Sequence, residues 1–300
     1  MDVYLIFDMG GTSVKYACGD EEGCLKDTGS FPTPSDGLEA MLDEMRRVFD
    51  SVKEKITGIA LSSPGAVDPV KGIVGGISAI PYIHEISLTE RISRRLDGLP
   101  VTIENDGNCS ALGELWKGAA AGKRNIVSVV CGSGIGGSIV INGAVCRGRT
   151  NNCGEFGNCL VNRADGHYKT WSSYTMVKQA AKYTAATGKR TDGKGLFELA
   201  EGGDPLALQL TEEFYEAMAV GLFSIQFTLD TELIVLGGGI SEAPFVIPEI
   251  YKRMEKMAKE DRFGFLTPKI VPCRFGNKAN LYGALFHHLQ EMKQYKVRLF

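Results

Sequence analysis

The chain opens with VYLIFDMGGTSVKYACG (residues 3–19), the stretch that decides how the rest of the sequence is interpreted. An apolar run, Val3–Phe7, is followed by an aspartate, a pair of glycines and a second run, Val14–Cys18. Apolar runs of this length bounded by glycine are typical of β-strands joined by a tight turn. We therefore expect a β-hairpin here, with Asp8 at the end of its first strand.

An α/β pattern continues beyond this hairpin. Within Ser35–Val52 the apolar residues recur at three- and four-residue steps, which predicts an amphipathic helix. Short strands are predicted at Ile56–Leu61 and Val101–Ile103. Each runs into polar residues, Ser62–Gly65 after the first and Glu104–Asp106 after the second. The sequence thus places polar side chains where strands of a sheet meet the loops that follow them.

The second half of the chain repeats the opening. A strand predicted at Ile126–Val130 is followed by glycines and a β-branched run, Ile139–Ile141, with Asn142–Gly143 as the hairpin turn. A shift of 126 residues lays residues 136–140 on residues 10–14 and matches the glycine pair. We expect two related α/β halves. The remaining strand and helices of the second half are predicted at Leu233–Leu236, Thr175–Thr187, Ala207–Leu229, Pro248–Lys259 and Leu281–Gln294.

Composition restricts the class of protein. Three hundred residues favour two domains, and a net charge of −3 provides no basic excess for a nucleic-acid partner. No run approaches the roughly 18 consecutive apolar residues of a membrane-spanning helix, so we expect a cytoplasmic, unprocessed protein without a membrane partner. None of the eight cysteines forms a CxxC pair, which favours reduced thiols. Cys153 and Cys159, six residues apart, are a weak metal candidate.

Three glycine motifs bear on function. Gly132–Gly137 satisfies G-x-G-x-x-G, but a dinucleotide-binding fold needs a helix after it, and here a β-branched strand follows. Gly118–Arg124 is one residue short of a P-loop and lacks its hydroxyl. The backbone amides of glycine hairpins can still bind phosphates, and Gly237–Gly239 adds a third glycine turn after a strand. The alternative is that these glycines only permit tight turns.

Six short motifs, in this order, resemble the ROK family of sugar kinases and repressors: Asp8–Lys15, Ser63–Gly65, Glu104–Asn108, Gly132–Gly137, Gly154–Gly157 and Leu236–Gly239. The resemblance spans nearly the whole chain. It implies the two-domain actin-like, or ribonuclease-H-like, α/β fold, which accounts for the internal repeat. The expected domains are a small one, 1–115 plus 284–300, and a large one, 116–283, with nucleotide and sugar in the cleft between them.

The resemblance also assigns roles to single residues. Asp106 resembles the catalytic base that accepts the proton of the sugar hydroxyl, and Asp8 resembles the carboxylate near Mg²⁺ and the phosphates. Asp106 precedes a helix predicted at Cys109–Trp116, so a helix cap is its alternative role. A cap or turn residue is the alternative to a sugar contact for Asn105. The expected nucleotide-binding residues are Asp8, Gly10, Gly11, Thr12, Lys15, Gly132, Ser133, Gly134, Gly238 and Gly239. The expected sugar-binding residues are Gly65, Asn105, Asp106, Glu155 and Asn158.

One departure from the family pattern concerns zinc. Many ROK kinases carry a histidine at the position of Asn158, followed by a cysteine-rich zinc-binding segment, and Cys159–Tyr174 contains no such cysteine cluster. We therefore expect ATP and Mg²⁺ as cofactors and no structural zinc. The pattern is similar to a zinc-less subset that includes β-glucoside kinases, which leaves the substituents at C1 and C2 of the sugar open.

The sequence thus predicts an ATP-dependent kinase that phosphorylates a hydroxyl, expected to be the 6-hydroxyl, of a hexose such as glucose or a β-glucoside. The domains of such a kinase close on the sugar and exclude water. An N-acylhexosamine kinase of the N-acetylmannosamine type is an alternative. A sugar-responsive regulator is another, although the phosphate motif begins at Asp8 and leaves no room for a DNA-binding extension. A catalytically silent sugar-binding protein is disfavoured by the intact Asp8 and Asp106. A homodimer is the family-level expectation.

Overall fold

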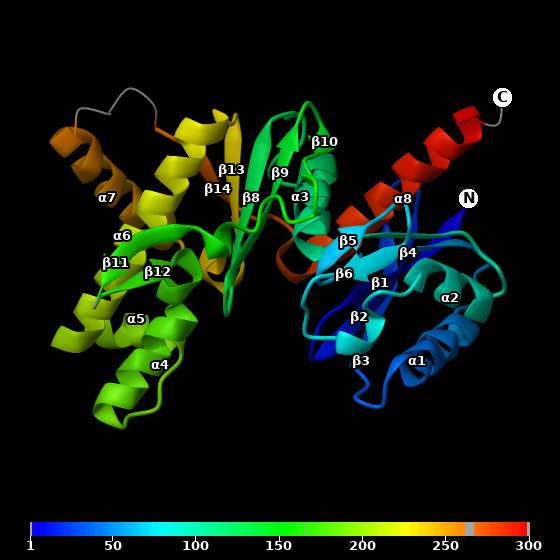
Figure 1. Ribbon diagram of the computed structural model, residues 1–300, viewed down its shortest axis with the longest axis horizontal. Helices are drawn as coiled ribbons and strands as arrows, with labels where there is room; N and C mark the ends of the chain where they lie inside the picture. Colours follow the sequence, from blue (N-terminus) through cyan, green and yellow to red (C-terminus); the bar gives the residue numbers. More distant parts are fainter. Residues whose placement is uncertain (1, 165, 262–266, 299–300) are drawn as a thin grey trace. The chain divides into compact units, whose positions relative to one another are not determined.

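The computed structural model describes residues 2–164, 166–261 and 267–298, which fall into two compact units (Figure 1). The chain passes between the units four times. Unit 1 consists of Met1–Gly122, Arg147–Cys153 and Asn277–Phe300, and unit 2 consists of Lys123–Cys146 and Gly154–Gly276.

These bounds differ from the predicted 1–115 plus 284–300 and 116–283. All of helix α8 (Ala279–Arg298) belongs to unit 1, because it packs along helix α3 (Asp106–Lys117) of that unit. The segment Arg147–Cys153 also returns to unit 1, where Arg147 forms an ion pair with Glu104. Residues 299–300 of the predicted small domain lie outside the described residues.

Unit 1 is built on a five-stranded mixed sheet in the order β3-β2-β1-β4-β7. The first three strands are antiparallel neighbours, as the predicted hairpin requires, and β4 and β7 run parallel to β1. The carboxyl ends of the parallel strands therefore share one edge of the sheet. The strands are β1 (Val3–Met9), β2 (Ser13–Asp20), β3 (Leu25–Pro32), β4 (Ile56–Ser63) and β7 (Val101–Asn105).

Side chains of β1 alternate between two hydrophobic cores, because successive residues of a strand point to opposite faces. Leu5 and Phe7 pack on one face with α1 (Leu38–Ser51) and α2 (Leu88–Arg95). Tyr4 and Ile6 pack on the other face with α3 and α8. The sheet is therefore covered on both sides, and its central strand is buried along its whole length. A small hairpin, β5 (Ala66–Asp68) and β6 (Ile73–Gly75), and the short helix η1 (Pro81–Ile83) follow β4.

Unit 2 contains a second five-stranded sheet in the order β10-β9-β8-β13-β14. Its first three strands are antiparallel neighbours and its last two run parallel to β8, which is the arrangement of unit 1. The predicted internal repeat is thereby confirmed at the level of strand order. The strands are β8 (Ile126–Cys131), β9 (Ile135–Ile141), β10 (Ala144–Val145), β13 (Leu233–Gly237) and β14 (Ile270–Pro272).

The register predicted for this repeat is wrong. The turn of the first hairpin lies between Met9 and Val14, and that of the second between Cys131 and Ile135. The glycines at 136–137, which the shift of 126 residues placed on the first turn, lie inside strand β9. A Cβ on Gly137 would lie 2.6 Å from Cδ2 of Phe156, so this glycine makes room for an aromatic ring.

The helices of unit 2 lie near the predicted positions, and several begin at a capping side chain. Asp204, for example, accepts hydrogen bonds of 3.0 Å from the amides of Leu206 and Ala207, so α6 starts two residues before the predicted Ala207. The helices are α4 (Met176–Thr187), α5 (Gly193–Glu201), α6 (Pro205–Leu229) and α7 (Val246–Asp261). The short elements are η2 (Phe156–Asn158), β11 (Leu160–Ala164), β12 (His167–Thr170), η3 (Trp171–Tyr174), η4 (Gly239–Glu242) and η5 (Gly276–Lys278), of which η5 begins in unit 2 and ends in unit 1.

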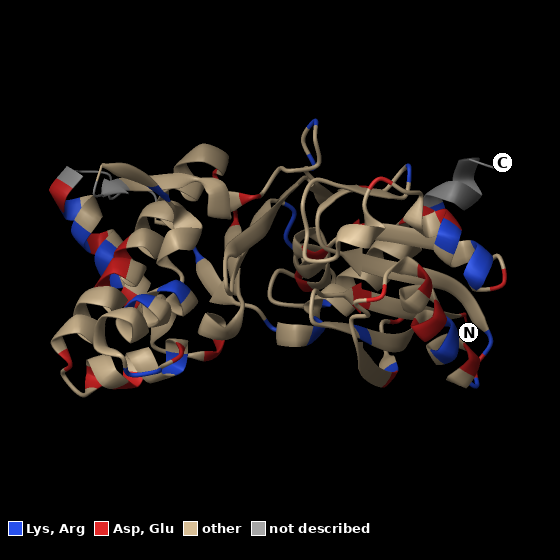
Figure 2. Ribbon diagram, turned by 60° about the horizontal axis from the view of Figure 1, so that its bottom comes forward, with Lys and Arg blue, Asp and Glu red and all other residues tan. Residues whose placement is uncertain are grey.

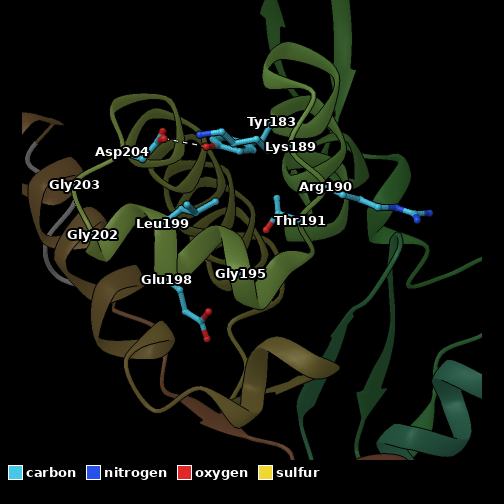
Figure 3. Close-up of a pocket in the computed structure, with 10 residues that line it drawn as sticks. All are labelled: Tyr183, Lys189, Arg190, Thr191, Gly195, Glu198, Leu199, Gly202, Gly203 and Asp204. Carbon is cyan, nitrogen blue, oxygen red and sulfur yellow. Dashed lines mark hydrogen bonds between the residues drawn. The ribbon is translucent and has the colours of Figure 1, made fainter.

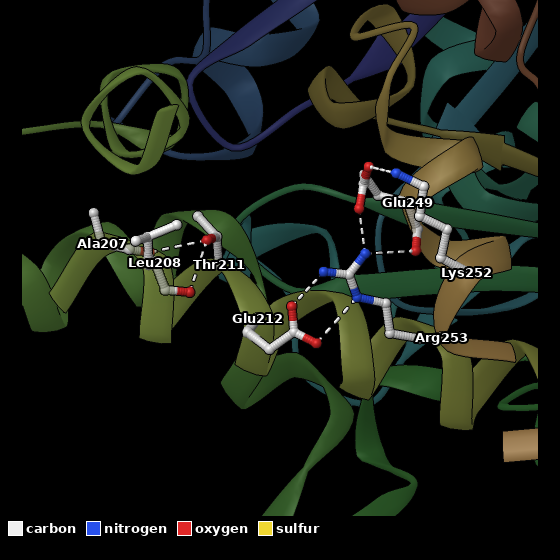
Figure 4. A network of polar contacts seen from close by, with 7 residues as sticks. All are labelled: Ala207, Leu208, Thr211, Glu212, Glu249, Lys252 and Arg253. Atoms are coloured by element: carbon white, nitrogen blue, oxygen red, sulfur yellow. Dashed lines mark hydrogen bonds and ion pairs between the residues drawn. The ribbon is translucent and has the colours of Figure 1, made fainter. Parts of the chain in front are cut away.

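A polar network joins α6 to α7 (Figure 4). Arg253 of α7 donates from Nε to Glu212 of α6 at 3.1 Å and from Nη1 to the carbonyl of Glu249 at 3.1 Å. The same guanidinium lies 4.8 Å from the ring centroid of Tyr215, and burial raises the pKa of that tyrosine. Because Glu212, Glu249 and Tyr215 all belong to unit 2, we infer that this network stabilises the packing of α6 on α7.

Charges of both signs are interspersed over the helices of each unit (Figure 2). Within the described part of the chain, no helix is both long and apolar enough to span a membrane.

A buried histidine of α8 makes the stability of unit 1 depend on pH. His288 is fully buried, its Nδ1 lies 2.9 Å from Oγ1 of Thr102, and desolvation together with the neighbouring His287 lowers its pKa to about 4. At pH values between about 4 and the ordinary pKa of 6.5, His288 is protonated in the unfolded chain and neutral in the folded chain. The stabilisation is therefore present above pH 6.5 and is lost as the pH falls towards 4.

We expect His288 to contribute about 2 kcal/mol to the loss of unfolding free energy between pH 7 and pH 4.5. Urea unfolding at both pH values measures this loss. The variant His288→Gln keeps a hydrogen-bonding side chain and should lose correspondingly less stability over the same interval. An equal loss in the wild type and the variant would contradict the assignment.

Candidate active site

Asp8 is the last residue but one of strand β1 and is 7% exposed. Its Oδ1 accepts hydrogen bonds from Oγ of Ser62 at 2.7 Å and from Nδ2 of Asn280 at 3.0 Å. Its Oδ2 faces Nζ of Lys15, its partner across the hairpin, at 3.9 Å. The carboxylate is therefore fixed through one oxygen, and the other faces a cation.

The turn between β1 and β2 is tied down by its own backbone and by β3. The amide of Gly10 donates to the carbonyl of Ser13 at 3.1 Å, and Oγ1 of Thr33 donates to the carbonyl of Gly10 at 2.5 Å. A Cβ on Gly11 would lie 2.5 Å from Cβ of Ala79, so only glycine fits there without displacement. The turn thus has one conformation and lies beside Lys15 and Asp8, as the hairpin prediction expects.

The motif after β7 forms the start of α3. Asn105 is the N-cap of this helix: its Oδ1 accepts from the amide of Asn108 at 3.1 Å, and its Nδ2 donates to the carbonyl of Gly65 at 3.0 Å. The cap prediction for Asn105 is confirmed. The prediction that the helix begins at Cys109 is wrong, because the cap allows it to start at Asp106.

Asp106 is the first residue of α3. Its Oδ1 accepts from Nδ2 of Asn105 at 3.0 Å and from the amide of Gly107 at 2.8 Å. Gly65, whose carbonyl accepts from Asn105, has a φ of 101°, a conformation that favours glycine. Unit 1 therefore brings Gly65, Asn105 and Asp106 together at the carboxyl edge of its sheet.

The second glycine turn, Gly132–Gly134, belongs to unit 2. The amide of Gly132 donates to the carbonyl of Gly134 at 2.9 Å, and strand β9 follows the turn. This confirms that the G-x-G-x-x-G letters do not form a dinucleotide-binding turn. Thr175, the N-cap of α4, donates from Oγ1 to the carbonyl of Ser133 at 3.3 Å. The turn is thereby attached to a helix.

The third glycine turn lies beside the second. Gly238 has a φ of 86°, and a Cβ on it would lie 2.1 Å from the carbonyl oxygen of Cys131, the residue before Gly132. The amide and Oγ of Ser241 donate to the carbonyl of Gly238 at 3.0 and 2.8 Å. Gly238, Gly239 and the turn Gly132–Gly134 therefore lie at one edge of the second sheet.

Glu155 and Asn158 also lie in unit 2, Glu155 as the residue before η2 and Asn158 as its last residue. The amide of Asn158 donates to the carbonyl of Glu155 at 3.2 Å, and desolvation raises the pKa of the Glu155 carboxyl. Gly157, between them, packs so closely on strand β9 that a Cβ would lie 2.1 Å from the carbonyl oxygen of Ile135. The predicted site residues thus form one group in each unit.

Sequence reasoning missed four residues that support these groups. None of them was assigned a role, because the contacts that reveal them join positions far apart in the chain, such as Asn280 and Asp8, 272 residues apart. Only the position of Glu104, next to the polar pair Asn105–Asp106, was a signal in the sequence. The missed residues are Ser62, Glu104, Arg147 and Asn280.

A pocket of about 680 Å³ lies elsewhere in unit 2, among α4, α5 and the start of α6 (Figure 3). Its lining includes Tyr183, Lys189 and Asp204, and none of the predicted site residues. Tyr183 donates to Asp204 at 2.9 Å, and Asp204 caps α6. We interpret this pocket as the junction of three helices.

Among the described residues, no group of three or more His, Cys, Asp or Glu side chains is placed to hold a metal ion. Mg²⁺ in phosphate-transferring sites is commonly held by one or two carboxylates together with substrate phosphates. Asp8, with one oxygen not used by Ser62 and Asn280, fits that mode.

Comparison with known proteins identifies the family. Residues 4–291 match the ROK family. The chain belongs to the ROK family. It is 33% identical to a β-glucoside kinase of Listeria innocua over 97% of this chain and 98% of that protein.

Solved ROK structures are similar to this chain along nearly its whole length. A ROK family protein from Streptococcus pneumoniae, in complex with sucrose, is 35% identical with a TM-score of 0.89, covering 97% of this chain and 99% of the other. A ROK family glucokinase from Streptomyces griseus, in complex with glucose and AMPPNP, is 26% identical with a TM-score of 0.78, covering 94% and 97%. The predicted actin-like α/β fold is confirmed.

Proposed function

We propose that this ROK protein is an ATP-dependent sugar kinase that transfers the γ-phosphate to a hydroxyl, the 6-hydroxyl in particular, of a hexose such as glucose or a β-glucoside. The observation that carries the proposal is Asp106 at the start of α3, oriented by Asn105 and Gly107 beside Gly65. The naming of similar proteins as β-glucoside kinase and glucokinase supports it.

Asp106 is the proposed catalytic base. In phosphoryl transfer the protein contributes mainly positioning and charge stabilisation, so a carboxylate of ordinary basicity suffices. The hydrogen bonds from Asn105 and Gly107 hold Oδ1, which fixes how the carboxylate meets the attacking hydroxyl. As the hydroxyl oxygen bonds to the γ-phosphorus, the bond from that phosphorus to the β–γ bridging oxygen breaks and ADP leaves. The proton of the hydroxyl passes to Asp106. The hydroxyl is thereby made a better nucleophile without a covalent enzyme intermediate.

The proposed phosphate contacts are backbone amides and Lys15. In unit 1 the amides come from Gly11 and Thr12, and in unit 2 from Ser133 and Gly134, followed by Gly238 and Gly239. The amides of Gly10 and Gly132 donate within their own turns, so the role of these two glycines is to let the backbone approach the phosphates. Mg²⁺, when bound with the nucleotide near Asp8, supplies charge neutralisation for the phosphates. Asp8 is held ready for this role by Ser62 and Asn280.

Substitution of Thr175, which binds the turn Gly132–Gly134, tests the proposal that this turn contacts the nucleotide. The variant Thr175→Val loses both the cap to the amide of Lys178 and the hydrogen bond to Ser133, so we expect it to be about 1 kcal/mol less stable. We also expect KM for ATP to rise while KM for the sugar stays near the wild-type value. Thr175→Ser retains the hydroxyl and is the matched control. A rise in KM for the sugar alone would contradict the assignment.

Gly65, Asn105, Glu155 and Asn158 are the proposed sugar contacts, in addition to Asp106. Carboxylates and amides suit a ring of hydroxyl groups, and a glycine lets the backbone approach the ring. Asn158 stands where many family members use a zinc-binding histidine, so we propose that this enzyme works without structural zinc. Activity should survive a zinc-selective chelator in the presence of excess Mg²⁺.

A coupled assay with ATP and Mg²⁺ over a panel of sugars tests the function. The panel contains glucose, β-glucosides such as cellobiose, N-acetylmannosamine and N-acetylglucosamine. Turnover of glucose or a β-glucoside supports the proposal, and exclusive turnover of an N-acylhexosamine would replace it by the N-acylhexosamine alternative. Sugar binding by folded protein without turnover of any member would overturn it in favour of a sugar-responsive regulator.

We further propose that the enzyme is a cytoplasmic homodimer, because ATP is regenerated in the cytoplasm and dimers are the expectation for the family. Size exclusion with light scattering measures the oligomeric state, and a monomer at assay concentration would contradict it.

A further inference from the structure

Glu104, the residue before Asn105–Asp106, is a carboxylate without solvent exposure. Its Oε1 accepts hydrogen bonds from the amide of Asn105 at 2.8 Å and from Nδ2 of Asn108 at 2.9 Å. Both donors belong to the loop and first turn that hold Asp106. Oε1 of this buried carboxylate therefore stabilises the conformation of the loop that carries Asp106.

The other oxygen is bound by an arginine from a distant part of the chain. Arg147 donates to Oε2 of Glu104 through Nε at 3.1 Å and also through Nη2. These two donors converge on one oxygen, a fork that arginine provides and lysine, with a single nitrogen, does not. The Arg147 side chain is 31% exposed while that of Glu104 is fully buried, so Arg147 is the charge that compensates a carboxylate removed from water.

Arg147 also begins the short segment Arg147–Cys153 that the chain sends back to unit 1 between two stretches of unit 2. The amide of Cys153 donates to the carbonyl of Arg147 at 3.2 Å, which closes this segment into a loop. The chain then continues directly into Gly154 and Glu155 of unit 2, the second being a proposed sugar contact. The ion pair between Arg147 and Glu104 therefore holds, within unit 1, the segment that continues along the chain to Glu155 of unit 2.

We propose that Arg147 is a positioning residue of the kinase: through Glu104 it fixes the loop that carries Asp106. The proposal rests on the proposed function for its kinetic consequence, whereas the effect on the loop is independent of any activity. Without the arginine, the buried Glu104 carboxylate loses its charge partner and moves, and its hydrogen bonds to Asn105 and Asn108 weaken.

The decisive variant is Arg147→Lys, which keeps the charge and loses the fork. We expect kcat to fall about tenfold or more, because misplacing a reacting group by about 1 Å can cost about a hundredfold, with little change in KM for the sugar. We also expect faster hydrogen exchange at the amides of Asn105 and Asn108. Arg149→Lys, an exposed arginine on the same loop, is the matched control and should match the wild type in both measurements.

A double-mutant cycle separates positioning from general stability. Arg147→Gln is expected to lower kcat more in the presence of Glu104 than in the background Glu104→Gln, because the neutral amide leaves no buried charge behind. If Arg147→Gln fails to fold, the lysine variant and its hydrogen exchange still decide the question.

Each outcome has one meaning. Slower turnover and faster exchange in Arg147→Lys, at a melting temperature close to that of Arg149→Lys, support the proposal. Equal kcat and equal exchange in the two variants would overturn it, as would a loss of activity that only follows the unfolded fraction. If the wild type phosphorylates no sugar, the proposed function fails, and hydrogen exchange alone then decides whether Arg147 positions the loop.

Discussion

Replacement of Asp106 by asparagine should lower kcat about a thousandfold, within the range that a positioned base contributes. Asparagine has nearly the same shape and can still accept from Asn105 and the amide of Gly107 through its oxygen. It cannot accept the proton of the attacking hydroxyl. The sugar should therefore bind with nearly wild-type affinity while phosphoryl transfer is lost, which a coupled assay and isothermal titration calorimetry measure separately.

Two comparisons make this result specific. Asp97→Asn removes a carboxylate from a surface ion pair with Arg46, and it should leave kcat unchanged. A variant Asp106→Asn that retains more than about a tenth of wild-type kcat would show that Asp106 is not the base. If the sugar affinity of Asp106→Asn also collapsed, Asp106 would be chiefly a binding residue.

The largest effect on stability is expected at Gly283, where helix α8 crosses α3. A Cβ on Gly283 would lie 1.7 Å from the carbonyl oxygen of Cys109 and 2.7 Å from its Cα, and a Cβ on Gly113 would lie 2.5 Å from the carbonyl oxygen of Ala279. The obstacles are backbone atoms, which cannot rotate away as the end of a side chain can. Alanine at 283 would therefore force the two helices apart.

We expect Gly283→Ala to lose about 3 kcal/mol or more of unfolding free energy, at the upper end of what overpacking costs. Activity should fall as well, because α3 begins at Asp106 and α8 begins beside Asn280, which binds Asp8. Urea unfolding measures the change. Gly136→Ala, at a glycine of strand β9 with open space around it, should cost far less. Equal midpoints for the two variants would contradict the close crossing of α3 and α8.

Much of the fold follows from local patterns in the sequence. The run Val3–Phe7 is apolar throughout because β1 is buried on both faces, and glycines must follow it because the hairpin turn packs on Ala79. The helix predicted within Ser35–Val52 is α1, whose apolar residues face the core at helical spacing. Elements without such a pattern were missed. None of the described side chains of β11 and β12 is buried, and α5 begins with two glycines in its first turn.

In the internal repeat, residues that match in sequence do not occupy equivalent positions in the structure. The two halves share a strand order, yet the matching letters at 10–14 and 136–140 are not equivalent positions, because one glycine pair forms a turn and the other lies in a strand. A glycine is required wherever a Cβ would collide, and such collisions come from turns and from packing alike. Only the tertiary structure tells the two apart.

For the candidate site too, some features follow from the sequence and others only from the tertiary structure. The sequence by itself determined the family resemblance, the polar residues at the ends of β1, β4 and β7, and the proposal of Asp106 and Asp8 as the chemical groups. Short motifs carry this information because a strand end and the loop after it are contiguous in the chain. Only the tertiary structure decided how those groups are held: Asp8 by Ser62 and Asn280, and the Asp106 loop through Glu104 by Arg147. These supports join residues 43 to 272 positions apart, and a single sequence contains no local pattern that pairs them.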